Sequence, residues 1–534
     1  MRKHWYIAFL LGLVTLLYAF PILRNPARNI ADGYDGVFST WGMNWSAWSI
    51  LFHLQGFYDA PIFYPYTSAT TFSDPMFSSG LLAAPLLLTI KEPLIANAVS
   101  VVLGFFLLAL GTYAFIEKVT RQRAIAFATA LLVSFGSVHI RYLGHLHTFF
   151  IPAIPWGLFV WFRYIETKDV RFLVTWTLLF LFQVFNSPFS GVFYLFSCML
   201  FIFHKQSVRA FKKHIRLIGI ILGFTLVVSL LFYLPYVLTA TQYHSARTIR
   251  DAAHFALSVD ELIGSSRGLS FAGWGLLLFT AYTLYQSVAH KRKTHPLAVG
   301  SFVIACATLV MTLGPALKWV GNTVKIPFPI PLPYVAAYAL IPGFQAFRDP
   351  SRWMLLSFFM LCITAAFVIP KKRGVLFLLV STIMLMAERG WSYPTVTLPS
   401  WKERPAVYRW IQTQKATTVL FLPPHLYAFP ETAVEETRRM LWTLPWDRNQ
   451  VLRLYNGYSG FAPQERVDEI VRFAMTFPSQ DTVEALRQLS PDIVIINHEF
   501  QRVDRETAIQ LLGYQKTYQD DAFAGYTKTS LSDR

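Results

Sequence analysis

Long runs of apolar residues recur through the first 390 residues and are nearly free of charged side chains. The clearest runs are about 17–25 residues long, enough for a helix to cross roughly 30 Å of hydrocarbon. A helix of a water-soluble domain needs a polar face, which these runs lack. The sequence therefore predicts an α-helical polytopic membrane bundle of about eleven transmembrane helices. The predicted segments are residues 6–22, 93–116, 124–140, 148–164, 172–186, 188–203, 217–240, 271–289, 297–313, 353–369 and 375–387.

Basic side chains cluster in alternate connections between the apolar segments. Connections rich in Lys and Arg face the cytoplasm, so this alternation predicts a cytoplasmic N-terminus and an outward C-terminus. The other connections are mostly longer and poorer in basic residues, and we expect them on the outer side. The basic clusters lie at 2–3, 118–123, 163–171, 205–216, 291–293 and 371–373, and the outward connections lie at 23–92, 141–147, 241–270 and 314–351.

The formal net charge of +17 belongs to the apolar part of the chain. From Trp391 onward there are 16 Lys and Arg against 17 Asp and Glu, so the basic excess lies before that point. We attribute it to membrane orientation and to contact with lipid headgroups. The composition therefore predicts the lipid bilayer as a partner and does not predict nucleic acid.

The sequence predicts two domains, which meet where the apolar segments stop and charged residues become frequent. Residues 1–390 form a transmembrane domain with a large first outer loop at 23–92, and residues 391–534 form an extracytoplasmic, soluble α/β domain. Short apolar runs predict strands at 417–422 and 492–497. Helices are predicted at 405–413, 433–443, 464–476, 482–488 and 505–512.

Two carboxylates, Asp32 and Asp35, follow the first apolar segment and are flanked by glycines. Glycine lets the backbone turn sharply, so both acids can reach one point. Such a pair suits a divalent cation, Mg²⁺ or Mn²⁺, with open positions for phosphate oxygens, or one catalytic base beside one metal ligand. A solvated turn after a helix is the simpler interpretation. The position above a membrane bundle favours the functional one.

The same loop continues with aromatic and proline residues at 63–66, which fit an element at the level of the lipid headgroups. Asp74 follows. It is either a third acid of the site, in contact with a lipid-linked substrate, or the N-cap of a helix that begins at Pro75.

The second outward connection carries Arg141, His145 and His147. An imidazole can bind a metal, shuttle a proton or contact a pyrophosphate, and a guanidinium pairs with phosphate. These residues are therefore candidates for substrate binding. Hydrogen bonding that only stabilises a helix end is the alternative.

A third outward connection places Arg348 and Arg352 just before the tenth apolar segment. Two arginines four residues apart can clamp a phosphate. Pro350 lies between them and interrupts a continuous helix, and Asp349 can instead neutralise Arg348. The hypothesis of a phosphate clamp and that of a local ion pair both remain open.

Taken together, these features resemble the GT-C superfamily of polytopic glycosyltransferases, in particular the bacterial membrane proteins grouped with it. The resemblance rests on the acids of the first outer loop, the aromatic outer loops, the stretch 342–352 and the outward C-terminal segment with residues 456–460. It covers most of the chain with loose motifs. Asp32 and Asp35 are spaced more widely than the tight acidic pairs of several members.

The resemblance implies an inverting transfer of a hexose or pentose from a polyprenyl-phosphate-linked donor to an extracytoplasmic acceptor, which is an envelope glycan, lipid or protein. It implies that Asp35, or less readily Asp32, is the catalytic base or a metal ligand. Arg141, Arg348 and Arg352 would then stabilise the phosphate charge that develops. The expected location is the bacterial plasma membrane, with the active loops and the C-terminal domain outside.

Two other classes of function fit the same features. A flippase or other transporter of lipid-linked saccharides needs a similar bundle, but such proteins usually carry internal repeats and ionisable residues near mid-membrane, which are not evident here. A non-catalytic factor in envelope assembly would use the C-terminal domain to bind a partner. Loss of function on removing that domain, but not on Asp35→Ala, would favour the assembly factor.

Overall fold

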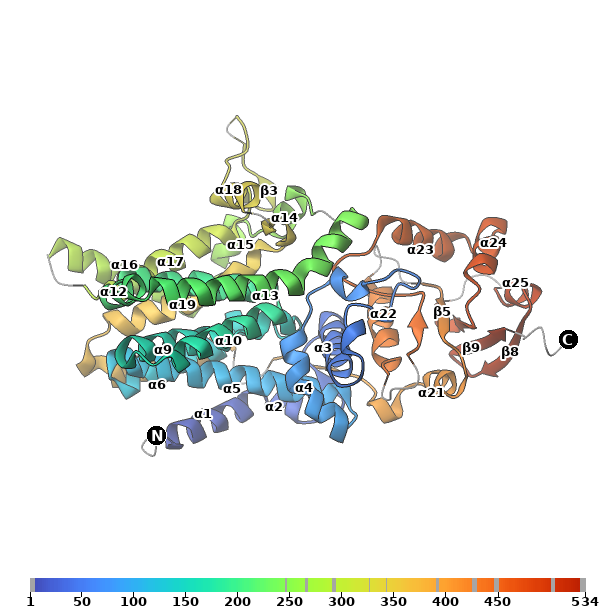
Figure 1. Cartoon of the computed structure of the whole chain (residues 1–534), viewed down its shortest axis with the longest axis horizontal. Coiled ribbons are helices and arrows are strands. Elements are labelled where there is room, and N and C mark those ends of the chain that lie inside the picture. Colours follow the sequence, from blue (N-terminus) through green and yellow to red (C-terminus); the bar gives the residue numbers. More distant parts are fainter. Residues whose placement is uncertain are drawn as a thin grey trace. The chain divides into compact units, whose positions relative to one another are not determined.

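The computed structural model describes residues 5–244, 247–264, 268–290, 294–325, 327–341, 343–389, 393–424, 430–445, 451–500 and 505–528. These residues form two compact units (Figure 1). Unit 1 contains Met1–Leu23, Val101–Tyr233 and Ala246–Pro394, and unit 2 contains Arg24–Ser100, Leu234–Ser245 and Thr395–Arg534. Among the features predicted from sequence, the basic residues at 2–3 and 291–293 and Pro342 lie outside the described residues.

Unit 1 is built from helices, because a helix satisfies its own backbone hydrogen bonds where no water is present. Every predicted apolar segment contains at least one helix. The long and medium helices are α1 (Trp5–Tyr18), α5 (Pro93–Thr120), α6 (Arg123–Phe135), α9 (Ala153–Thr167), α10 (Val170–Asn186), α11 (Pro188–Cys198), α12 (Lys205–Lys213), α13 (Ile215–Gln242), α16 (Phe271–Ala289), α17 (Pro296–Thr312), α19 (Trp353–Val368) and α20 (Gly374–Arg389). The first residues of α5 and the last of α13 belong to unit 2.

Shorter elements of unit 1 lie mostly in the connections that the charge pattern assigns to the outer side. They are α2 (Phe20–Leu23), α7 (Ser137–Ile140), α8 (Leu146–Phe149), α14 (Ile249–Phe255), α15 (Val259–Gly264), α18 (Pro333–Leu340) and the hairpin of β2 (Lys318–Trp319) and β3 (Asn322–Thr323).

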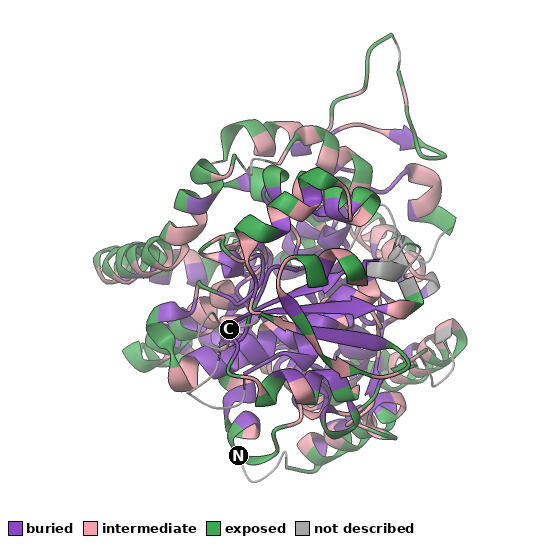
Figure 2. Ribbon diagram, turned by 90° about the vertical axis from the view of Figure 1, so that its right-hand side faces the viewer, coloured by how far each residue is buried: buried purple, intermediate pink, exposed green. Residues whose placement is uncertain are grey.

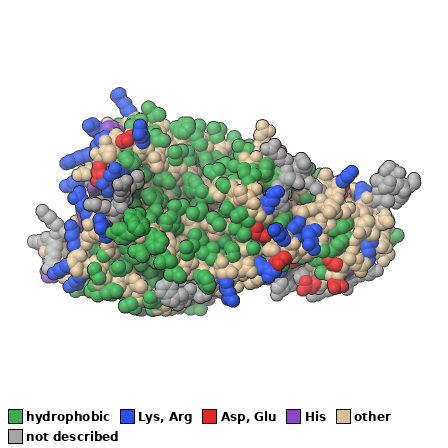
Figure 3. Space-filling model, turned by 90° about the horizontal axis from the view of Figure 1, so that it is seen from below, with side chains coloured by type: hydrophobic (Ala, Val, Ile, Leu, Met, Phe, Trp, Pro, Cys, Tyr) green, Lys and Arg blue, Asp and Glu red, His purple; other side chains and the backbone are tan. Residues whose placement is uncertain are grey.

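Five helical stretches in the described part are long and apolar enough to cross a membrane: Pro93–Thr120, Arg123–Ile140, Leu146–Thr167, Ile215–Gln242 and Pro350–Val368. A sixth is present if Pro188–Phe203 and Lys205–Lys213, which are bent by 102°, count as one span. Figure 3 shows apolar side chains covering a broad face of the helical part. The chain is therefore an integral membrane protein, and the count of eleven spans stays a prediction.

Unit 2 contains a five-stranded sheet of order β6-β5-β7-β9-β8. The first three strands are parallel and the last two pair antiparallel. The predicted strands are confirmed as β5 (Thr418–Leu422) and β7 (Ile493–Asn497), and every residue of both is buried (Figure 2). The strands β6 (Arg453–Leu454), β8 (Tyr514–Gln519) and β9 (Phe523–Lys528) were not predicted.

Helices and a second small sheet complete unit 2. The five helices predicted in its C-terminal segment are confirmed as α21 to α25, with bounds that differ by up to three residues. The helices are α3 (Asp35–Phe52), α4 (Phe77–Thr89), α21 (Ala406–Thr413), α22 (Pro430–Trp442), α23 (Gln464–Thr476), α24 (Gln480–Leu489) and α25 (Glu506–Leu511). The small sheet pairs β1 (Asn29–Ile30) with β4 (Val396–Thr397).

Residues 61–64 of the first outer loop, which we call the edge segment, run along the free side of the edge strand β6. The Leu454 N–H donates to the Pro61 carbonyl at 3.0 Å, and the Tyr64 N–H donates to the Leu454 carbonyl at 2.9 Å. The Arg466 guanidinium also donates to the Tyr64 carbonyl. The sequence predicts that the loop 23–92 belongs to the transmembrane domain. The structure groups residues 24–100 with the sheet in unit 2, and these hydrogen bonds join residues 61–64 to its edge.

The carboxylate of Asp492 joins the starts of β5 and β7. It accepts hydrogen bonds from the Thr417 N–H at 2.7 Å, the Thr417 hydroxyl at 2.8 Å and the Thr418 N–H at 2.9 Å. Burial opposes ionisation of this carboxyl, but the hydrogen bonds outweigh burial and hold its pKa below the usual value. The ionised form therefore stabilises the folded sheet.

We expect Asp492→Ala to lower the free energy of unfolding at pH 7 by about 1.5–3 kcal/mol, the range for hydrogen bonds to a charged group. Because the folded pKa is depressed, this stability is present above the unfolded pKa of about 3.9 and is lost as the pH falls through the folded pKa. Thermal unfolding in detergent should show a difference between wild type and variant that shrinks below about pH 4. The exposed Asp468→Ala on α23 is the matched control, and an equal effect there would contradict the assignment.

Candidate functional site

Asp32 organises the start of α3. Its Oδ1 accepts hydrogen bonds from the Tyr34 N–H at 2.7 Å and the Gly36 N–H at 3.3 Å. These N–H groups belong to the start of the helix, which attracts negative charge. A Cβ on Gly36 would lie 3.2 Å from the Asp32 Cβ, so glycine allows this tight return of the chain. Asp32 therefore has a structural role that the sequence did not distinguish from a catalytic one.

Asp35 is the first residue of α3 and is half-buried. Aromatic rings surround its turn of helix. The ring of Tyr458 lies 4.8 Å from that of Tyr34 and 5.4 Å, edge-on, from that of Phe38. Tyr34 precedes Asp35 by one residue, and Phe38 follows it by three. An aromatic wall thus lies at the same turn as the predicted base.

Tyr458 belongs to residues 456–461, which fold onto the first outer loop. The Asn456 side chain accepts from the Phe421 N–H at 2.6 Å and donates to the Phe421 carbonyl at 3.0 Å, which fixes the start of this segment to β5. A Cβ on Gly457 would lie 3.0 Å from the ring of Phe63. The ring of Phe461 lies 5.5 Å from that of Phe72. The segment singled out in the sequence therefore closes over the loop that carries the acids.

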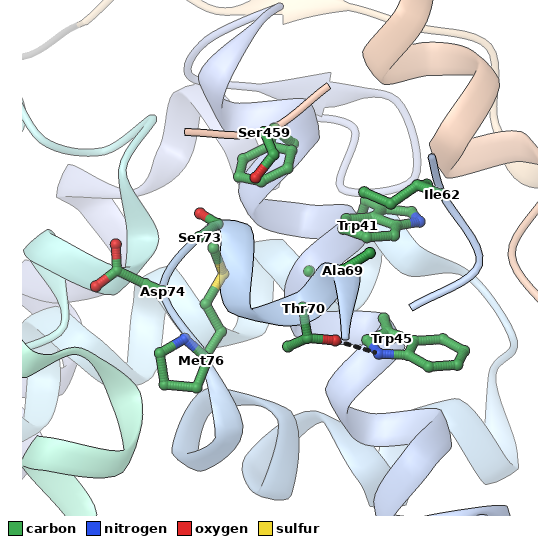
Figure 4. Close-up of a pocket in the computed structure, with 12 residues that line it drawn as sticks. Trp41, Trp45, Ile62, Ala69, Thr70, Ser73, Asp74, Met76 and Ser459 are labelled. Carbon is green, nitrogen blue, oxygen red and sulfur yellow. Dashed lines mark hydrogen bonds between the residues drawn. The ribbon is translucent and has the colours of Figure 1, made fainter. Parts of the chain in front are cut away.

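A narrow pocket with room for about one water molecule lies along α3 from the turn after Asp35. Four residues of α3 line it with the spacing of one helix face, together with residues of the first outer loop and Ser459. The lining is Phe38, Trp41, Gly42, Trp45, Ile62, Ala69, Thr70, Ser73, Asp74, Pro75, Met76 and Ser459. Figure 4 shows the tryptophans on one side, Asp74 on the other and Ser459 near the top. The pocket is mostly aromatic and apolar, with a few polar groups.

Hydrogen bonds fix the wall of this pocket. The Trp45 Nε1–H donates to the Phe57 carbonyl at 3.0 Å and to the Thr70 hydroxyl at 3.1 Å. The Ser46 hydroxyl donates to the Pro75 carbonyl at 2.8 Å. The aromatic residues of α3 that line the pocket are three to four residues apart, a spacing in the sequence that predicts a shared helix face.

The structure answers one of the alternatives for Asp74. Helix α4 begins at Phe77, its N-cap is Met76 in the left-handed conformation, and no side chain caps it. The prediction that Asp74 is the N-cap of a helix beginning at Pro75 is therefore wrong, because the chain turns at Met76 before the helix starts. Asp74 instead lines the pocket, while a substrate-binding role for it stays a prediction.

A divalent cation at Asp32 and Asp35 also stays a prediction. The described residues contain no group of three or more His, Cys, Asp or Glu side chains that could hold a metal ion. Asp32 already accepts two backbone N–H groups, and the positive end of a helix repels a cation. These two residues therefore fit a resident cation poorly.

Arg141, His145 and His147 lie together in unit 1, around the short helix α8. The rings of His145 and His147 are 5.7 Å apart, and His147 is buried. The Arg141 Nη2 donates to the Gly268 carbonyl at 3.2 Å. The structure therefore places the two histidine rings side by side and holds Arg141 on the backbone of a second connection, while their role in substrate binding stays a prediction.

Arg348 precedes the single 3₁₀ turn Pro350–Arg352 and Arg352 ends it, and each guanidinium lies over an aromatic ring. Arg348 lies 5.1 Å from the ring centre of Phe255, and Arg352 lies 4.9 Å from that of Phe189. Asp349 pairs with Arg352 at 3.4 Å, while its predicted pairing with Arg348 stays a prediction. The proline turn causes the pairing with Arg352, because it brings the third residue after Asp349 back to its carboxylate.

No family model matches the chain, and no curated protein sequence matches it. The cryo-electron microscopy structure of arabinofuranosyltransferase AftD from Mycobacteria aligns with 99% of this chain at a TM-score of 0.56 and 11% identity. A mutant of AftD aligns over the same share, with a TM-score of 0.56 and 12% identity.

This likeness concerns the fold. The aligned chain accounts for 40% of AftD in the first structure and 42% in the second, so our chain spans less than half the length of that enzyme. It shares its fold with part of this arabinofuranosyltransferase.

Proposed function

We propose that the protein is a membrane glycosyltransferase that moves a sugar from a polyprenyl-phosphate-linked donor to an extracytoplasmic acceptor. The fold shared with AftD supports the reaction class. The observation that carries the proposal is the position of Asp35, half-buried at the first turn of α3 and beside the aromatic wall of Tyr34, Phe38 and Tyr458. A carboxylate can accept the proton of a sugar hydroxyl, and aromatic rings can pack against the faces of sugar rings.

In the proposed reaction, Asp35 removes the proton from an acceptor hydroxyl. The acceptor oxygen attacks the anomeric carbon of the donor from the face opposite the phosphate, and a new glycosidic bond forms. The bond between the anomeric carbon and the phosphate oxygen breaks, and its electron pair leaves with polyprenyl phosphate. The configuration at the anomeric carbon is inverted. Arginine side chains stabilise the negative charge that develops on the leaving phosphate.

Asp32 and Asp35 have separate roles in this proposal. Asp32 accepts the N–H groups of Tyr34 and Gly36, and thereby holds the first turn of α3 in place. Asp35 is then presented at a fixed point of the loop. Catalysis requires that a reacting group be held within about 0.5 Å of its productive position, and Asp32 supports Asp35 in this way.

The lipid-linked donor can be tested by native mass spectrometry of the gently solubilised protein. We expect wild type to retain a polyprenyl phosphate or a polyprenyl-phosphate sugar, and the variant Arg348→Ala/Arg352→Ala to lose it. The reason is that a guanidinium binds a phosphate by charge-assisted hydrogen bonds. The measured quantity is the fraction of protein that carries the lipid.

The control is Lys371→Ala/Arg373→Ala, which removes two exposed basic residues of the same unit. Because Arg352 is buried and paired with Asp349, thermal unfolding of each variant must accompany the measurement. Loss of the lipid in a folded Arg348→Ala/Arg352→Ala variant, but not in the control, supports the phosphate-binding role. Only bulk phospholipid on folded wild type would contradict the lipid-linked donor and favour an assembly factor.

A further inference from the structure

Helix α12 (Lys205–Lys213) runs in a different direction from the helical stretch before it. It follows Pro188–Phe203 with a bend of 102°. One of its faces is fixed to α9, because the Trp161 Nε1–H donates to the Ser207 hydroxyl at 3.1 Å. Ser207 and Ala210, one turn apart on this face, are both buried. This short helix is thus turned away from the stretch before it and is held against α9.

The opposite face of α12 is exposed and basic. Lys205, Arg209, Lys212 and Lys213 are all exposed, and Phe211 stands among them with 40% of its surface accessible. The sequence from 170 to 250 contains no Asp or Glu, so no acid of α11, α12 or α13 offsets these charges.

The acidic side chain of the packed neighbour α9 is engaged elsewhere. Glu166, the acid of α9, pairs with Lys118 and lies 3.7 Å from Arg163. Figure 3 shows that Lys and Arg side chains gather at one end of the helical part, next to its apolar face. The charge of α12 is therefore directed outward.

Apolar side chains border α12 on both sides along the chain. Ile202 before the helix is 67% exposed, and Ile215 and Ile220 after it are 52% and 71% exposed. Ile202 lies in the apolar stretch Pro188–Phe203, and Ile215 and Ile220 lie in α13, whose one charged side chain is Arg216, so hydrocarbon covers these isoleucines in the membrane. The basic face of α12 consequently lies at the depth where lipid phosphates are found.

We infer that α12 is an interfacial helix whose basic face binds the phosphate groups of anionic phospholipids. Phe211 enters the boundary between headgroups and acyl chains, as aromatic residues of interfacial helices do. An anionic lipid fits better than an acidic protein because exposed isoleucines flank the basic residues directly, and a protein partner would have to displace lipid from them. This inference does not depend on the proposed sugar transfer.

The test uses the full-length protein in neutral detergent, titrated with phosphatidylglycerol or phosphatidylcholine and read by native mass spectrometry. The variant is Lys205→Gln/Arg209→Gln/Lys212→Gln. The matched control, Lys371→Gln/Lys372→Gln/Arg373→Gln, removes the same charge from another exposed basic turn. Each basic residue near a membrane surface contributes about fivefold in affinity at low salt. We therefore expect the α12 variant to bind phosphatidylglycerol at least about tenfold more weakly, and the control to change less than about threefold.

The titrations distinguish specific binding of anionic lipid by α12 from an effect of total charge. A preference of wild type for phosphatidylglycerol that the α12 variant loses, and that weakens between 50 and 300 mM salt, supports it. Equal loss in the two triple variants overturns it, because total charge would then explain binding. Equal binding of phosphatidylcholine overturns it as well. Binding of polyglutamate to α12 without any preference for phosphatidylglycerol would instead identify an acidic polypeptide as the partner. Phe211→Ser, which keeps all charges, should weaken binding by a smaller factor.

Discussion

Replacing Asp35 with asparagine is expected to reduce sugar transfer by at least about a hundredfold while the protein stays folded and inserted. Asparagine has nearly the same size as aspartate but cannot accept the proton of an acceptor hydroxyl. The loss should appear in kcat, with KM little changed, because the base acts in the transition state. The assay follows release of polyprenyl phosphate from a synthetic short-chain polyprenyl-phosphate pentose or hexose in detergent.

Asp32→Asn is the matched control for Asp35→Asn. An asparagine oxygen at position 32 can still accept the N–H groups of Tyr34 and Gly36, so the first turn of α3 should persist. We expect a loss of activity well below that of Asp35→Asn, and Asp35→Glu should recover part of the activity. An Asp35→Asn protein with wild-type turnover would remove the catalytic base from the proposal.

Replacing Arg439 with methionine should destabilise unit 2 by about 3–5 kcal/mol. Arg439 on α22 is only 2% exposed and pairs with the fully buried Glu436 at 3.0 Å. It also donates to the Pro423 carbonyl at 3.1 Å, just after β5. The variant leaves the Glu436 carboxylate in the interior without its arginine, and this desolvated charge is the cause of the loss. Thermal and chemical unfolding in detergent measure it.

Two further variants test whether the loss of stability comes from the buried position of the ion pair. Glu436→Gln/Arg439→Met removes both charges, so we expect it to be more stable than Arg439→Met alone. Arg487→Met breaks the exposed pair with Glu484 and should cost no more than about 1 kcal/mol. A change of less than about 1 kcal/mol in Arg439→Met would contradict the importance of the buried pair.

The sequence predicted the apolar helices and the strands β5 and β7, because burial on both faces produces continuous apolar runs. It missed β6, which has two residues, and β8, an edge strand that alternates polar residues with Tyr514 and Tyr518. It also missed β9, which contains a glycine. A Cβ on that residue, Gly525, would lie 2.7 Å from the ring of Trp410. Pairing of these strands depends on tertiary contacts that no local pattern records.

The candidate site was predictable in its acids but not in its surroundings. Asp35 was identified from its glycine neighbours and its place after the first apolar segment. Tyr458, more than four hundred residues later, reaches the same turn only through contacts with Tyr34 and Phe38. The grouping of 24–100 with the sheet was equally hidden, because the edge segment pairs with β6 through backbone atoms that every residue possesses.

The edge segment sets an order of events during biosynthesis. Tyr64 pairs with Leu454, which is made 390 residues later. At about 5–20 residues per second, the ribosome needs roughly 20–80 s to supply that strand. Until then the loop with Asp35 lacks both its neighbouring strand and Tyr458. A nascent chain that stops before β6 would therefore carry the predicted base without Tyr458 of the aromatic wall, so the candidate site is completed only after residue 458 has been made.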